Sequence, residues 1–255
     1  MALNHKGSGA LMERLRKEVG QVKAEHYPIK VDNAFVLWFA EAYLVGDRRK
    51  AFDGVVGGPG DKTVDAVYVD ERNRIVQLVQ GKYHYADARD DSALCDFAAR
   101  ARDFWSADFA EELKHAGPGA RRHLQEAHRI LHGHNKGDFQ LRLYFVTTGR
   151  IAPKCQTRAK QIAAVSGNTR LEVLDRSAVL GIFSDWLEGS SPPLSELEIL
   201  VDGPQTLVHQ GGHLQGWIFT TNSQEVSRLY KTAGERLFAR NVRGYLGGDT
   251  SINRR

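Results

Sequence analysis

Two strand-like segments separated by a polar turn constrain the fold of this chain more than any other feature. The segments 63–69 and 75–82 are rich in β-branched and aromatic residues, which suit the surface of a pleated sheet. A two-residue turn at positions 72–73 would pair Asp70 with Ile75. The pattern therefore predicts an antiparallel hairpin.

Polar side chains gather on one face of this predicted hairpin. Counting back from the turn along both strands places Asp65 opposite Gln80. Because side chains alternate between the two faces of a strand, Gln80 and Lys82 lie on the same side. Burying such groups without partners is costly. We call Asp65, Gln80 and Lys82 the hairpin patch, and we expect it to have a ligand.

A carboxylate upstream adds a fourth candidate. The segment 34–45 is apolar on every face, which predicts a buried helix, with Asp32 or Asn33 as its cap and Gly46 as its stop. Glu41 is the only charge in this segment, so it must be neutralised, paired with a cation or bound to a metal. One interpretation is that Glu41 forms a salt bridge at the helix edge. The other is that Glu41 binds a metal, and the presence of the hairpin patch favours this second interpretation.

Helical and strand patterns alternate along the rest of the chain. Helices are predicted over 8–25, 92–114 and 153–165, and two more helices are predicted to end at about 132 and at 186. Strands are predicted over 139–147 and 171–174. This alternation predicts an α/β fold with a mixed sheet flanked by helices. Two cysteines far apart, Cys95 and Cys155, indicate neither a disulfide framework nor a cysteine zinc site.

A Gly-, Ser- and Pro-rich segment, 189–193, predicts a domain boundary. The chain is expected to form one domain over 1–188 and a small C-terminal α+β lobe over 189–255. Strands over 197–201 and 216–221 and a helix over 223–237 are predicted for that lobe.

Charge and composition narrow the choice of partner. The net charge of +4 and the pI of about 9.0 fit a polyanionic partner such as DNA. The candidate phosphate contacts are Lys62, His84, Lys154, Arg158 and Lys160. The alternative for the basic helix residues is an ordinary solvated helix face, and the alternative for His84 is a strand-end histidine whose hydrogen bonds are satisfied within the protein. Neither a membrane span nor a secretion signal is evident, so we expect a cytoplasmic protein without a membrane partner.

The chemistry that suits these residues is metal-dependent phosphodiester hydrolysis. Mg²⁺, or Mn²⁺ as the alternative ion, takes oxygen ligands from one or two carboxylates and from phosphate. Asp65 and Glu41 would supply the carboxylates, and Gln80 would supply an amide oxygen. Lys82 would position the attacking water and offset charge in the transition state.

The same residues resemble a known family. Gly57-Gly58-x-Gly60-Asp61-x-x-Val64-Asp65-Ala66 followed by Gln80-Gly81-Lys82-Tyr83 resembles the Q-x-K form of the PD-(D/E)xK nuclease superfamily, as in Mrr-like restriction endonucleases. A second block, 237–247, is similar to the abortive infection phage resistance (AIPR) family. The resemblance implies a restriction-endonuclease-like sheet and a DNA endonuclease of anti-phage defence. It also implies catalytic roles for the hairpin patch, with Glu41 on the upstream helix.

Two departures from the family pattern keep other functions open. Gln80 stands where many members of the family have an acid. The chain is also shorter than members of the family usually are, so it resembles an N-terminal portion or a short form, and contact with downstream domains of a longer protein is a further expectation. A catalytically silent module that binds or senses nucleic acid is therefore an alternative. A ribonuclease would use the same residues, and pairing into a homo-oligomer would suit an enzyme that cuts both strands.

Overall fold

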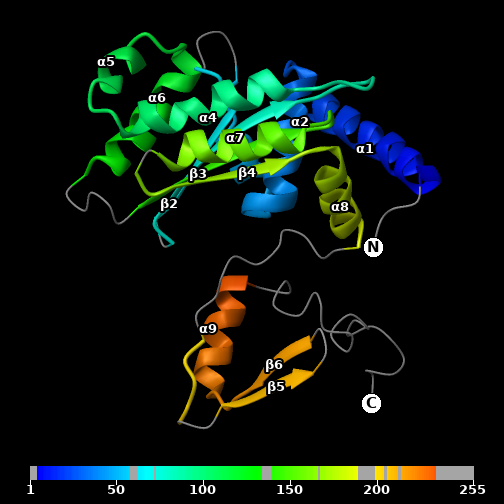
Figure 1. Cartoon of the computed structure of the whole chain (residues 1–255), viewed down its shortest axis with the longest axis vertical. Helices are drawn as coiled ribbons and strands as arrows, with labels where there is room; N and C mark the ends of the chain where they lie inside the picture. The colour runs from blue at the N-terminus through cyan, green and yellow to red at the C-terminus, as the bar shows by residue number, and fades with distance from the viewer. Residues whose placement is uncertain are drawn as a thin grey trace. The chain divides into compact units, whose positions relative to one another are not determined.

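The computed structural model describes residues 5–57, 62–71, 73–133, 139–165, 167–188, 199–203, 206–211 and 214–233. The chain separates into two compact units, Met1–Ser184 and Asp185–Arg255 (Figure 1). Within the described residues, no helix is both long enough and apolar enough to cross a bilayer.

The first unit is built on a four-stranded mixed sheet with the strand order β1-β2-β3-β4. The strands are β1 (Ala66–Asp70), β2 (Ile75–Lys82), β3 (Gln140–Thr147) and β4 (Thr169–Leu174). β1 pairs antiparallel with β2, and β2, β3 and β4 run parallel. Asp70 pairs with Ile75, so the predicted hairpin register is confirmed.

Helices cover both faces of this sheet, which confirms the predicted α/β class (Figure 1). The helices of this unit are α1 (His5–Glu25), α2 (Val31–Phe39), the π-helix η1 (Ala40–Val45), α3 (Arg48–Asp53), α4 (Asp91–Trp105), α5 (Phe109–Leu113), α6 (Pro118–Leu131), α7 (Pro153–Ala164) and α8 (Arg176–Leu187). One face of β2, with Leu78, joins the core under α4, α6 and α7. The other face packs against α2.

A glycine near the end of β2 lets α2 approach the sheet closely. A Cβ added to Gly81 would lie 2.3 Å from Cγ2 of Val36, so any side chain there would force the helix away. Asp32 joins the same two elements, since its Oδ1 accepts a hydrogen bond from the Tyr83 backbone N–H at 3.2 Å. The α2 helix is therefore held tightly against the end of β2.

The structure corrects two details of the apolar helix. The expected caps are wrong, because α2 already begins at Val31. Asp32 instead accepts the Tyr83 N–H, and Asn33 donates to the Gly57 carbonyl. The second half winds as the π-helix η1, which does end at Gly46 in the left-handed conformation (φ 71°).

The single long helix predicted over 92–114 is also wrong. The helix breaks after Trp105, where Ser106 has an extended backbone (ψ 131°), and α5 begins at Phe109. The break lets the buried rings of Phe104 and Phe109 pack at 5.1 Å. The Ser106 carbonyl pairs with Nε2 of His128 at 2.9 Å and also accepts the Phe109 N–H at 3.3 Å.

The second unit contains a hairpin of β5 (Leu207–Gly211) and β6 (Leu214–Ile218) and the helix α9 (Ser223–Ala233). Residues 199–201 do not form the predicted strand, because the Leu200 N–H donates to the Glu225 side chain at 3.0 Å. The predicted strand over 216–221 ends earlier, at Ile218. The predicted linker 189–193 lies outside the described residues.

Candidate active site

The carboxylate of Asp65 takes the place of a backbone carbonyl in the sheet. The Asp65 N–H donates to the carbonyl of Val79 at 2.8 Å, although Val79 is already the register partner of Ala66, so Asp65 lies just outside the regular β1–β2 pairing. Its own carbonyl turns toward the loop and accepts from the N–H groups of Val56 (2.8 Å) and Gly57 (3.1 Å). Oδ2 of its side chain accepts the Gly81 N–H at 2.8 Å instead. The carboxylate is thereby held directly beside β2.

Gln80 presents a buried acceptor that lacks a partner. The residue is 5% exposed, and side-chain alternation directs it to the face that carries Leu78 and Phe145. Its Oε1 is buried and has no hydrogen-bond partner among the described residues. An unpaired buried acceptor costs about 1–3 kcal/mol, and in native proteins such an oxygen commonly binds an ion or an ordered water. This oxygen therefore marks a ligand position.

Lys82 completes the hairpin patch on the same face. It lies two residues beyond Gln80, a separation of about 7 Å along a strand, and it pairs in register with Thr147 of β3. The side chain is partly buried, and among the described residues its amine forms no ion pair. The Asp65 carboxylate thus contacts β2 at Gly81, and the residues on either side of that glycine, Gln80 and Lys82, share one face of the strand.

The backbone that leads into Asp65 is strained. Lys62 (φ 57°) and Thr63 (φ 66°) are both in the left-handed region, which costs an L-residue roughly 1–2 kcal/mol each. Arg100 supports this turn through a 3.3 Å hydrogen bond from Nε to Oγ1 of Thr63. Strain of this kind is typical of functional sites. Nζ of Lys62, a predicted phosphate contact, lies 3.9 Å from a carboxylate oxygen of Glu112.

Glu41 lies elsewhere. Its carboxylate pairs with Nε of Arg48, and the same guanidinium pairs with Glu25 at 2.9 Å and with Glu18 at 3.7 Å. Burial raises the pKa of the Glu18 carboxyl, while the charge of Arg48 lowers it. Tyr43, two residues after Glu41, contacts the sheet, since its ring lies 6.2 Å from that of Tyr144 in β3.

These contacts correct the predicted role of Glu41. The helix that carries it follows α2, which covers the Gly81 face of β2, whereas Gln80 and Lys82 are on the opposite face. Glu41 pairs with Arg48 of α3, and that guanidinium also pairs with Glu18 and Glu25 of α1. The structure thus contains the salt bridge that was one of the two interpretations. The structure does not bring Glu41 to the hairpin patch.

A second polar group, not predicted from the sequence, lies at the end of the same strands. Nε2 of His84 is 2.9 Å from Oδ2 of Asp90, which also accepts a 2.6 Å hydrogen bond from Oγ1 of Thr147. Asp90 occupies the cap position of α4 but makes no capping hydrogen bond. Sequence reasoning missed it because an acid before a helix has the appearance of an ordinary cap.

The basic residues of α7 are exposed. Lys154, Arg158 and Lys160 project from the helix, whose buried side consists of Ala159 and Ala163. Within the described part of the chain, none of the three cations pairs with a carboxylate. They are available to phosphate groups, and a solvated helix face would have the same appearance.

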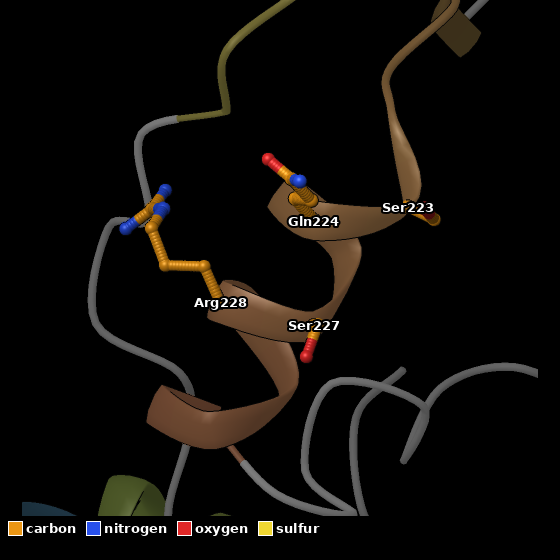
Figure 2. Close-up of a pocket in the computed structure, with 4 residues that line it drawn as sticks. All are labelled: Ser223, Gln224, Ser227 and Arg228. Carbon is orange, nitrogen blue, oxygen red and sulfur yellow. The ribbon is translucent and has the colours of Figure 1, made fainter.

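A cavity of about 450 Å³ lies along α9 in the second unit. It is lined by Ser223, Gln224, Ser227 and Arg228, whose side chains point in different directions from the helix (Figure 2). Arg228 pairs with Glu225, and its hydrogen bond, followed by that of the Leu200 N–H, lowers the pKa of Glu225 to about 2. The polar groups of this cavity do not converge, so the hairpin patch is the stronger candidate.

Gln80→Met separates a ligand role from a packing role. Methionine has a similar shape and needs no partner, so the variant should be more stable by about 1 kcal/mol. If the hairpin patch holds a metal that serves DNA cleavage, as the sequence predicts, cleavage should fall by about tenfold or more, because an oxygen ligand is removed. Urea unfolding and a plasmid cleavage assay measure the two effects. A less stable variant would show that Oε1 has a structural partner.

Comparisons with known proteins identify no relative: no family model, no curated protein and no solved structure matches this chain.

Proposed function

We propose that this chain is a metal-dependent endonuclease that hydrolyses DNA phosphodiester bonds at the hairpin patch. The observation that carries the proposal is the buried, unpartnered Oε1 of Gln80, which has the carboxylate of Asp65 on the neighbouring strand and the amine of Lys82 on the same face. A cation or an ordered water would satisfy this acceptor, and the neighbouring carboxylate favours the cation.

The donor set fits a hard divalent cation. Mg²⁺ prefers oxygen ligands and is commonly held by one or two carboxylates, with water and substrate phosphate completing its shell. Asp65 and Gln80 would hold it. When bound, the ion polarises the phosphoryl group and lowers the pKa of a bound water. Among the described residues, no cluster of three or more His, Cys, Asp or Glu side chains has the arrangement of a metal site, so the shell would rely on substrate oxygens.

The remaining residues act on the substrate. The Lys82 ammonium orients the attacking water and offsets the negative charge that develops on the phosphoryl oxygens. The hydrogen bond from the Gly81 N–H keeps the Asp65 carboxylate in place while the substrate enters. Lys154, Arg158 and Lys160 would contact backbone phosphates without reading the base sequence.

A role in anti-phage defence rests on the resemblance to the AIPR family, as does the restriction-endonuclease-like identity of the sheet. The first block of that resemblance includes the hairpin patch, whereas the second block, 237–247, lies outside the described residues. The role in anti-phage defence and the restriction-endonuclease-like identity of the sheet are therefore predictions.

The Arg48–Glu41 ion pair favours a second candidate function. With Glu41 neutralised, Asp65 is the one predicted carboxylate ligand at the hairpin patch. A module that binds nucleic acid without cutting it would tolerate that loss. Incubation with plasmid, linear DNA, single-stranded DNA and RNA, with and without Mg²⁺, tests both candidates. Cleavage of DNA that requires Mg²⁺ supports the endonuclease, cleavage of RNA alone indicates a ribonuclease, and binding without cleavage supports the silent module.

Glu41→Gln tests the position of that residue. Because its carboxylate pairs with Arg48, the variant should lose about 1 kcal/mol of stability and keep its cleavage rate. Glu25→Gln, which removes another partner of the same guanidinium, is the matched control. If Glu41→Gln abolished cleavage while Glu25→Gln did not, Glu41 would have to leave Arg48 and join the metal site.

A further inference from the structure

A cavity of about 190 Å³ lies beyond the carboxyl ends of the parallel strands in the first unit. It is lined by residues of α1, of the segment that follows β2, and of the start of α8, which follows β4. In open sheets with parallel strands, ligands typically bind at this edge. The position therefore marks a candidate binding site that is distinct from the hairpin patch.

Two arginines line this cavity, and the first is anchored rigidly. Nε of Arg176 donates to the Thr148 carbonyl at 2.7 Å, and Nη2 lies 3.0 Å from Oδ1 of Asp87. Asp87 is the acidic residue of the lining, and it also pairs with Arg150 at 3.1 Å. One carboxylate is thus shared by two guanidinium groups, which leaves an excess of positive charge.

The second arginine has a donor without a partner. Arg16 donates from Nη2 to the Tyr85 carbonyl, and its Nη1 lies 3.4 Å from Glu13. Its Nε, however, is buried and has no hydrogen-bond partner in the part of the chain that the structure describes. A buried N–H of a charged group is costly to leave unpaired, so Arg16 has donor capacity that its contacts with Tyr85 and Glu13 do not use.

His84 adds a third polar group to the lining. Its Nε2 is held by the buried carboxylate of Asp90, which fixes the orientation of the ring before any ligand arrives. His84 is two residues beyond Lys82, so the cavity follows the hairpin patch directly along the chain.

We propose that this cavity binds a phosphate group. Guanidinium groups present forked N–H donors that match phosphate oxygens, and two anchored arginines converge on one small space. A whole small-molecule ligand usually occupies about 300–1,000 Å³, so the smaller volume suits a single group of a longer strand. The phosphate binding stands independently, and its use to hold a strand for cleavage rests on the proposed function.

Calorimetric titration with inorganic phosphate tests the proposal on the full chain. The buffer contains no divalent cation, and KCl at equal ionic strength is the blank. The wild type should bind phosphate saturably. Arg16→Gln and Arg176→Gln should each weaken binding by about tenfold or more. Arg150→Gln is the matched control, because it also pairs with Asp87 but does not line the cavity, and its affinity should be unchanged.

Oligonucleotides with a 5′-phosphate or a 5′-hydroxyl identify the source of the group. Tighter binding of the phosphorylated strand, lost in Arg16→Gln, identifies a strand end; equal binding of both strands, weakened equally in that variant, identifies an internal phosphate. No saturable phosphate binding by the wild type would overturn the proposal. Equal weakening in all three arginine variants would also overturn it, since that is the response of a general surface potential. No bond is cut in this experiment, so a failure of the nuclease proposal leaves its result unaffected.

Discussion

Asp65→Asn is expected to abolish metal-dependent DNA cleavage without unfolding the protein. The amide keeps an oxygen that can accept the Gly81 N–H, so the link between β1 and β2 survives. The negative charge that would hold the divalent cation is lost. Cleavage should fall by at least about a hundredfold, because a bound metal supplies several kcal/mol of transition-state stabilisation.

Asp65→Ala separates the structural role of the residue from its chemical role. Alanine has no acceptor, so the Gly81 N–H loses its partner and stability should fall by about 1–3 kcal/mol. Initial rates on plasmid DNA across a Mg²⁺ titration, together with urea unfolding, distinguish the two variants. If Asp65→Asn cut DNA at the wild-type rate, the hairpin patch would not be the active site.

Lys82→Met should remove turnover and leave DNA binding nearly intact. Methionine keeps the length of the side chain but not the charge, and loss of a group that stabilises the transition state costs about 10²–10³ in rate. Affinity for the metal should be unchanged or higher, because a cation beside the site repels a second cation. Single-turnover rates and an equilibrium DNA-binding assay in Ca²⁺ measure the two effects.

Lys114→Met is the matched control for that experiment. Lys114 is an exposed lysine that pairs with Glu111, and it follows the short helix α5 rather than the sheet. Its loss should change neither rate nor binding. A full cleavage rate in Lys82→Met would assign Lys82 to structure, and an equal loss of binding and rate would assign it to substrate affinity instead.

The features that could be predicted were local in the sequence. Alternation with a period of two residues and a polar turn were enough to set the pairing of Asp70 with Ile75, and with it the common face of Gln80 and Lys82. The left-handed stop at Gly46 followed from the type of residue alone. Each of these depends on neighbours along the chain or across one tight turn.

Tertiary packing settled the rest. Glu41 pairs with Arg48, seven residues away, and that arginine is placed by further ion pairs to Glu18 and Glu25 of α1. The group of His84, Asp90 and Thr147 likewise joins three separate segments. Short-range patterns report which face of a helix or strand is apolar. They do not report which helix covers that face, or which of several nearby cations pairs with a partly buried carboxylate.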